Sequence, residues 1–211
     1  MAFEDQIEWL APDNFPDLSK YETISIDLET RDPDLKSKGS GAIIGNGEIV
    51  GISVAVDNWC KYYPFGHEGG GNLDKKKILT WIKSVCATKA TKVFHNAMYD
   101  VCWLRSYGIN INGCIKDTMV MASLINENRV SYALNALSWE YLRKRKDESI
   151  LNEAAKSCGI DPKAELYKLP AMYVGIYAEK DAKLTLELFE KLTEICDLET
   201  ILFPCLVDMR F

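Results

Sequence analysis

The sequence predicts one α/β domain in which a mixed β-sheet is flanked by α-helices. A chain of 211 residues with 47% hydrophobic and 27% charged residues suits a single globular domain with a sizeable core. Three apolar, strand-like segments come first, and strand-like and helix-like patterns alternate after them. Strands in series favour antiparallel pairing and alternating strands and helices favour parallel pairing, so both kinds are expected in one sheet.

Each element follows from hydrophobic spacing and turn residues. Residues 1–22 are polar, contain Pro12 and Pro16, and are predicted to form an N-terminal extension. A loop is expected over 30–48, and Asn72 is expected to cap the helix that follows the first three strands. Strands are predicted at about 23–28, 49–56, 61–63, 91–94 and 114–115. Helices are predicted at about 74–87, 96–107, 118–125, 132–142, 150–158 and 170–196.

The histidine and cysteine content restricts the metal chemistry that the chain can support. Seven cysteines are scattered without a Cys-x-x-Cys pair, which is typical of reduced thiols and argues against a zinc ribbon. His67 and His95 are the two histidines, too few for a histidine-based zinc site. A bound metal is therefore expected to take oxygen ligands, as Mg²⁺ or Mn²⁺ does.

The charge balance limits the partners. A net charge of −6 argues against a broad grip on duplex nucleic acid. The basic clusters Lys75–Lys77 and Arg143–Lys146 are expected to be solvated helix faces and ends, with contact to a nucleic-acid backbone as the alternative for the second. Because the chain has neither an apolar run of ~18 residues nor a signal-peptide pattern at its start, a soluble, cytoplasmic protein is expected.

Asp27 and Glu29 come at the end of the first predicted strand, two residues apart. Side chains two apart in a strand point to the same face, so these carboxylates would lie side by side. Two such anions repel each other, which raises the pKa of at least one of them unless a cation lies between them. The pair therefore favours a metal site over an ordinary surface.

Two later segments supply further carboxylates. Asp100 is predicted on the first turns of the helix after the fourth strand, and Tyr177 and Asp181 share one face of the last helix. That face is otherwise apolar, and an aspartate buried in it is costly unless it is neutralised. Asp27, Glu29, Asp100 and Asp181 are therefore expected to face one cleft.

These segments carry a family resemblance. Asp27-x-Glu29, Asn96-x-x-x-Asp100 and Tyr177-x-x-x-Asp181, in this order, resemble the three motifs of the DEDD-superfamily exonucleases, in the subclass that bears a tyrosine. The chain is most similar to the 3′–5′ proofreading domain of family A (Pol I-like) DNA polymerases, particularly bacteriophage ones. The resemblance implies a ribonuclease H-like fold, with the exonuclease domain over 23–200 and the start of a connection to an absent polymerase domain over 201–211.

The resemblance also implies roles for these residues. Asp27, Glu29 and Asp181 would hold the ion that activates water, with Asp27 bridging to a second ion that Asp100 reaches directly or through water. Tyr177 would orient the attacking water together with Glu29. Two Mg²⁺ (or Mn²⁺) ions would thus release deoxynucleoside 5′-monophosphates from the 3′ end of single-stranded DNA. The cell compartment would be the host cytoplasm for a phage protein.

Other residues near these motifs have structural or substrate-binding interpretations. Asp117 is expected to cap the helix that begins at Thr118, and His95 to be structural. Asn96 could contact substrate or tie the strand-to-helix turn, and both interpretations stay open. Residues that could stack on or separate the terminal bases are Leu28, Thr30, Phe65 and Met98.

Two other functions remain open from the sequence. One is a stand-alone exonuclease that trims RNA 3′ ends with the same fold and metal ions. No feature of the sequence reads a 2′-hydroxyl, so only the tail that resembles family A polymerases favours DNA. The other is a catalytically inactive exonuclease fold used as a binding module. The complete set of four carboxylates with Tyr177 argues against the second, because burying them has a desolvation cost.

Overall fold

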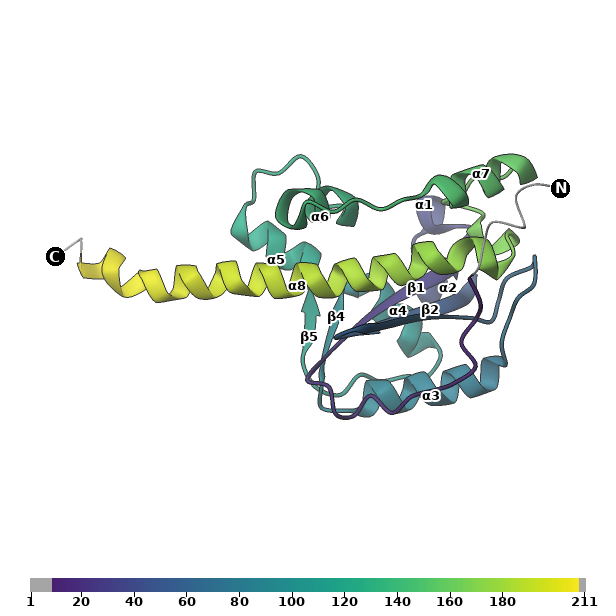
Figure 1. Ribbon diagram of the computed structural model, residues 1–211, viewed down its shortest axis with the longest axis horizontal. Coiled ribbons are helices and arrows are strands. Elements are labelled where there is room, and N and C mark those ends of the chain that lie inside the picture. The colour runs from purple at the N-terminus through teal and green to yellow at the C-terminus, as the bar shows by residue number, and fades with distance from the viewer. Residues whose placement is uncertain (1–8, 209–211) are drawn as a thin grey trace.

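The computed structural model describes the secondary structure of residues 9–208 and the side chains of residues 9–196. Within this part of the chain the strands form one five-stranded sheet in the order β3-β2-β1-β4-β5 (Figure 1). β1 pairs antiparallel with β2, β2 antiparallel with β3, and β4 parallel with both β1 and β5. The predicted mixed sheet is confirmed. The strands are β1 (Thr23–Arg31), β2 (Glu48–Val56), β3 (Trp59–Pro64), β4 (Thr91–Phe94) and β5 (Ile115–Asp117).

Helices cover both faces of the sheet. α3 and α4 lie on one face, and α8 crosses the other with α5, α6 and α7 beyond it (Figure 1). The C-terminal part of α8 extends past the edge of the sheet. The helices are α1 (Leu35–Lys38), α2 (Gly41–Ile44), α3 (Lys75–Ala87), α4 (Ala97–Ser106), α5 (Thr118–Ile125), α6 (Leu134–Leu142), α7 (Ser149–Cys158) and α8 (Ala171–Asp208), with a 3₁₀ turn at Leu166–Lys168.

The central strand β1 has an apolar face and a polar face. Ile24, Ile26 and Leu28 are buried in the main core together with residues of α3 and α4. Because side chains alternate along a strand, Asp27 and Glu29 point to the opposite face, toward α8. The period-two pattern of β1 thus directs both carboxylates at the helix that carries Asp181.

α8 packs closely on the sheet because its buried face contains small residues. Ala178 and Ala182 are fully buried there, and Ala182 packs with Ala55 of β2. Gly175 lies against the Trp9 indole, where a Cβ atom would come within 2.0 Å of a ring carbon. Glycine at this position therefore lets residues before β1 pack on α8.

Two predicted boundaries around β1 are wrong. The strand continues to Arg31 because its pairing with β2 runs to Glu48, so the carboxylate pair lies within the strand and is followed by a register shift after Glu29. The segment over 30–48 is not a plain loop, since its middle forms the short helices α1 and α2.

Two predictions about helix ends also need correction. Asp74, not Asn72, caps α3 by accepting a hydrogen bond from the Lys77 backbone nitrogen. Asn72 instead exchanges two hydrogen bonds with the backbone of His67. The last helix runs to Asp208 and is thus longer than the predicted 170–196.

The predicted division of the chain at residues 22 and 200 stays a prediction. Residues 1–8 and 209–211, which belong to the predicted extension and connection, lie outside the described residues. Among residues 9–208, no helix is both long enough and apolar enough to cross a membrane.

Candidate active site

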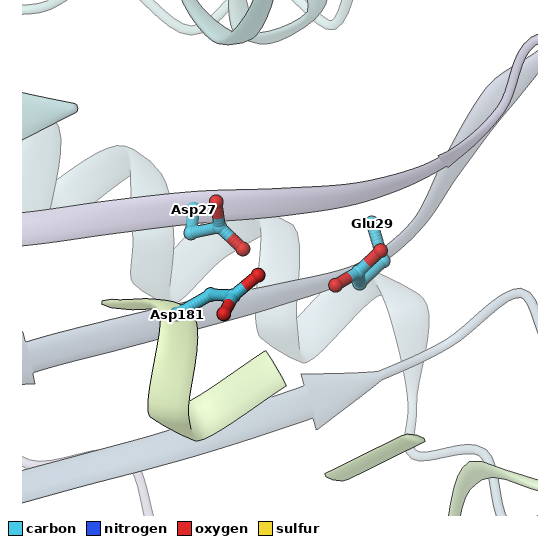
Figure 2. A group of neighbouring side chains, drawn as sticks. All are labelled: Asp27, Glu29 and Asp181. Atoms are coloured by element: carbon cyan, nitrogen blue, oxygen red, sulfur yellow. The ribbon is translucent and has the colours of Figure 1, made fainter. Parts of the chain in front are cut away.

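Three carboxylates from β1 and α8 meet on the polar face of the sheet. Asp27, Glu29 and Asp181 each offer one oxygen, and these oxygens lie within 4.8 Å of one another. Figure 2 shows the Asp27 and Asp181 side chains pointing toward one another, with Glu29 farther along the same strand. The sequence-predicted pair and the aspartate of the last helix are therefore neighbours in space.

The fourth predicted carboxylate faces the same region but is not in that group of three. Asp100 is only 4% exposed and belongs to the first turn of α4. Burial, and then the charges of Asp27 and Glu29, raise its pKa well above its usual range. All four predicted acidic residues thus interact electrostatically.

The turn that positions Asp100 is held by Asp117. Its carboxylate accepts hydrogen bonds from the backbone nitrogens of Asn96 (3.1 Å), Ala97 (2.8 Å) and Met119 (2.9 Å). This side chain therefore caps α5, as predicted, and also anchors the start of α4. His95 donates to or accepts from the Thr118 hydroxyl at 2.8 Å, in keeping with its predicted structural role.

Burial and mutual repulsion shift the titration of the acidic cluster. Burial, with the Asp181 charge, raises the pKa of Asp27 to about 7. Burial and the charges of Asp27 and Asp181 raise the pKa of Glu29 well above its usual range. The pKa of Asp181 is also raised by burial. These carboxylates thus repel one another, and a bound cation would reduce that repulsion.

Lys146 supplies one cation, which sequence reasoning missed. Its ammonium lies 2.5 Å from Asp181 Oδ2 and 5.1 Å from the centre of the Tyr177 ring, and both side chains of the ion pair are about nine-tenths buried. Lys146 is therefore not the solvated side chain that we expected of the Arg143–Lys146 cluster. The repulsion between Asp27 and Glu29 was the one sequence signal for a nearby cation. The spacing of residues in the sequence does not show which lysine supplies it.

Tyr177 lies one helical turn before Asp181 on α8. Burial, and then the negative charges of Glu29 and Asp181, raise the pKa of its hydroxyl. The hydroxyl therefore stays protonated at neutral pH and can donate a hydrogen bond to an oxygen near the cluster.

A buried tyrosine–histidine pair connects β3 to the start of α8 next to the site. The Tyr62 hydroxyl and His67 Nε2 are 2.7 Å apart, and His67 Nδ1 lies 2.9 Å from the Leu169 carbonyl oxygen, just before α8. Burial lowers the pKa of His67 to about 4, so the ring is neutral, Nδ1 donates to Leu169, and Nε2 accepts from Tyr62. Gly51, which pairs with Glu29 across the strands, leaves room for the Tyr62 ring.

The residues predicted to contact substrate differ in their exposure and in their hydrogen bonds. Met98 is 77% exposed at the start of α4. Leu28 and Phe65 are buried in the main core, so the prediction that their side chains stack on or separate the terminal bases is wrong. Thr30 shares a 2.7 Å hydrogen bond with the Tyr99 hydroxyl. Asn96 begins α4 in a left-handed conformation, φ 69°, without a side-chain capping bond.

A cleft of about 630 Å³ opens beside the acidic cluster. Glu29 and Tyr177 line it next to the cluster, and Trp139 of α6, 43% exposed, lines its wall. The guanidinium carbon of Arg145 lies 4.2 Å from the centre of the Trp139 ring. Lys163 and Lys146 also line this cleft, so it joins an aromatic surface and several cations to the carboxylates.

The residues of the cluster fit a divalent cation. Three carboxylate oxygens within 4.8 Å of one another form a hard, oxygen-only donor set, which Mg²⁺ and Mn²⁺ prefer. Asp181 Oδ1 is buried and has no hydrogen bond of ordinary length among the described residues, although the Tyr177 hydroxyl lies close enough to lower the pKa of this carboxyl. Since buried oxygens normally have a partner, this atom is available as a ligand.

Comparison with known proteins identifies the family. The sequence profile of a 3′–5′ exonuclease family, the exonuclease domain of family A DNA polymerases, matches residues 10–197. The chain belongs to this 3′–5′ exonuclease family. The resemblance inferred from the three motifs is confirmed, and with it the relation of this exonuclease domain to DNA-directed DNA polymerases.

Phage polymerases are among the relatives. The chain is 35% identical to a DNA-directed DNA polymerase of Pseudomonas phage M6, over 96% of the chain and 33% of that protein. It is 29% identical to the DNA polymerase DpoZ of Salmonella phage PMBT28, over 83% of the chain and 27% of that protein. The exonuclease chain thus spans about a third or less of the length of these relatives.

Solved structures share the fold at low identity. Escherichia coli RNase D matches with a TM-score of 0.57 and 17% identity, over 91% of this chain and 44% of that one. Brucella melitensis NrnC with bound Mg²⁺ matches with a TM-score of 0.58 and 16% identity, over 90% and 81%. These likenesses confirm the predicted ribonuclease H-like fold.

The raised pKa of Asp27 predicts how the stability of the exonuclease domain depends on pH. A carboxyl whose pKa rises from 3.8 to about 7 on folding stabilises the fold fully below 3.8, and this contribution is lost as the pH rises through about 7. In EDTA, the free energy of unfolding should fall between about pH 4 and pH 7. Asp27→Asn should reduce that fall by on the order of 2 kcal/mol, measured by urea denaturation.

The control for this measurement is Asp13→Asn, because Asp13 is exposed and far in sequence from the cluster. It should keep the wild-type pH dependence. If Asp27→Asn kept it as well, repulsion at the cluster would not be the cause.

Proposed function

We propose that the chain is a metal-dependent 3′–5′ exonuclease that proofreads DNA, removing deoxynucleoside 5′-monophosphates from single-stranded 3′ ends. The grouping of Asp27, Glu29 and Asp181 within 4.8 Å is the observation that carries this proposal. The membership of the chain in the 3′–5′ exonuclease family supports it.

Asp27, Glu29 and Asp181 would hold one divalent cation, and Asp27 and Asp100 a second. Two such ions would supply an activated water and neutralise charge on the phosphate. The protonated Tyr177 hydroxyl would donate a hydrogen bond to the attacking water, while Glu29 would accept one. Tyr62 and His67 would hold Glu29 and the start of α8 in place, so that Glu29 and Tyr177 keep fixed positions next to the phosphate.

The cleft would bind the strand that carries the 3′ end. A nucleobase would stack on the Trp139 ring in place of the Arg145 guanidinium, and Arg145 and Lys163 would offer positive charge to the backbone. A cleft with one aromatic wall suits a single strand better than a duplex, because stacking on Trp139 needs an unpaired base. The predicted contacts of Thr30, Asn96 and Met98 would flank the terminal nucleotide.

The polymerase relatives suggest a partner and a cell compartment for the exonuclease. Because the curated polymerases are about three times as long as this chain, a polymerase domain of the same polypeptide is the partner that we propose. The single-stranded 3′ end would come from that domain. A phage polymerase would work in the host cytoplasm.

Removing the central carboxylate should abolish hydrolysis. Asp27→Ala should lower the rate of Mg²⁺-dependent mononucleotide release by at least about a thousandfold, since metal-ion catalysis contributes several kcal/mol. Release of mononucleotides from a labelled single-stranded DNA oligonucleotide measures this, and an RNA oligonucleotide of the same sequence tests the alternative substrate.

Asp13→Ala, at an exposed position before β1, is the matched control and should retain full activity. Circular dichroism should show an unchanged fold for both variants. Substantial hydrolysis by purified Asp27→Ala protein would refute the assignment, and preferential hydrolysis of RNA would move it to RNA 3′ ends.

Tyr177→Phe tests the role of the hydroxyl. The hydroxyl orients water and is not proposed as a ligand, so the variant should slow hydrolysis by about a hundredfold, within the range for positioned proton donors and acceptors. Its Mn²⁺ affinity, measured by calorimetry, should stay close to that of the wild type. A loss of affinity as large as that of Asp181→Ala would contradict this role.

Trp139→Ala tests the strand-binding cleft. Loss of one stacking surface of about 1–3 kcal/mol should raise KM for single-stranded DNA by roughly tenfold and leave kcat nearly unchanged. Trp59→Ala is the control, because Trp59 belongs to β3 and lines a separate hollow beside α8. Equal effects of the two substitutions on KM would rule out a specific contact with Trp139.

A further inference from the structure

The loop between α6 and α7 is fastened to α8 by two lysines. Lys144 forms an ion pair with Glu187 at 2.7 Å, and Lys146 forms one with Asp181 at 2.5 Å. The backbone nitrogen of Lys146 also donates to Asn135 Oδ1 at 3.3 Å, which ties the loop to α6. The Lys146 ammonium therefore reaches the acidic cluster from a loop whose base is fixed.

The two ion pairs differ in their surroundings. The Lys144 side chain is 49% exposed, so its pair with Glu187 is screened by solvent. The Lys146 side chain is 10% exposed, and its charge acts on Asp27 and Glu29 as well as on Asp181. Lys146 thus compensates a whole group of carboxylates, whereas Lys144 compensates one.

A buried ammonium in this position competes with a metal ion. It lies against one oxygen of Asp181, while the other oxygen of the same carboxylate has no hydrogen bond of ordinary length among the described residues. Two cations sharing one carboxylate repel each other strongly at such distances. A divalent ion that binds Asp27, Glu29 and Asp181 therefore favours departure of the lysine.

The ammonium has a second set of partners within reach. Lys146 also lines the cleft with Arg145, Lys163 and Trp139, on the side where we place the DNA strand. A long, flexible side chain can move its charge by several ångströms while its backbone stays fixed. The nearest anion that a bound strand brings to this cleft is a backbone phosphate.

We propose that Lys146 exchanges partners during binding: it neutralises Asp181 until divalent ions bind, and then contacts a phosphate of the DNA strand in the cleft. Lys146 is thus a positioning residue that links metal binding to strand binding. The proposal rests on the proposed exonuclease function for the identity of the strand, but its metal-binding half concerns only residues of this chain.

Lys146→Met removes the charge and keeps the length of the side chain. The variant should bind Mn²⁺ about tenfold more tightly than the wild type, because a unit charge a few ångströms from the ion is gone. In EDTA its melting temperature should fall, since Asp181 is left without its partner, and saturating Mn²⁺ should remove the difference. Calorimetric titration with Mn²⁺ and thermal unfolding measure these effects.

The strand-binding half has its own measurement. An oligonucleotide with a hydrolysis-resistant phosphorothioate at its 3′ end is titrated by fluorescence anisotropy in saturating Mn²⁺ at several salt concentrations. Lys146→Met should weaken binding several-fold and lower the slope of log Kd against log salt by about 0.7, the value for one phosphate contact on a single strand. A purely structural lysine would leave this slope unchanged.

Lys144→Met is the matched control, because it removes the same charge from the same loop. It should change Mn²⁺ affinity by less than about twofold, since its charge is exposed and screened. Lys146→Gln, which is neutral but can still donate a hydrogen bond to Asp181, serves if Lys146→Met does not fold.

The outcomes separate this proposal from the proposed function. Unchanged or weaker Mn²⁺ binding by both neutral variants of Lys146, or an unchanged salt slope, would overturn the exchange. Tighter Mn²⁺ binding and a lower slope in a protein that hydrolyses no DNA would uphold the exchange and refute the exonuclease proposal.

Discussion

The burial of like-charged carboxylates between β1 and α8 is the constraint on which the site depends. Asp27, Glu29 and Asp181 lie closer together than their charges favour, and the burial of Asp181 and the half-burial of Asp27 and Glu29 limit the water that would screen them. Such an arrangement persists only where the surrounding packing holds it and a cation compensates it. The apolar face of β1, packed on α3 and α4, supplies the first condition, and Lys146 contributes to the second.

The position of α8 decides whether the carboxylates meet. Small side chains let the helix approach the sheet, and polar contacts fix where it starts. Glu179 Oε1 accepts hydrogen bonds from the Trp9 indole (3.0 Å) and from the Tyr62 backbone nitrogen (3.2 Å), while His67 connects Tyr62 to Leu169. A shift of α8 by one turn, about 5.4 Å, would carry Asp181 out of reach of Asp27. These contacts, remote from any reacting atom, therefore belong to the geometry of the site.

The exonuclease family of the chain and the surroundings of its acidic residues together describe the site. Its sequence over residues 10–197 matches the 3′–5′ exonuclease family of family A polymerases. In this chain the loop between α6 and α7 brings a buried lysine to the acidic residues, and an aromatic and cationic cleft lies beside them. The Lys146 ammonium therefore relieves part of the repulsion among the carboxylates within the chain itself.

The sequence by itself determined the mixed α/β architecture and the identity of the acidic residues. Both depend on local periodicity: two residues in a strand place Asp27 with Glu29, and four in a helix place Tyr177 with Asp181. Asp117 as a helix cap was likewise predictable, since the signal spans two residues. Only the tertiary structure decided that β1 extends past Glu29, that His67 supports Tyr62, and that Lys146 meets Asp181. Those contacts join segments far apart in the chain, and no spacing within one segment specifies which distant partner a buried charge will find.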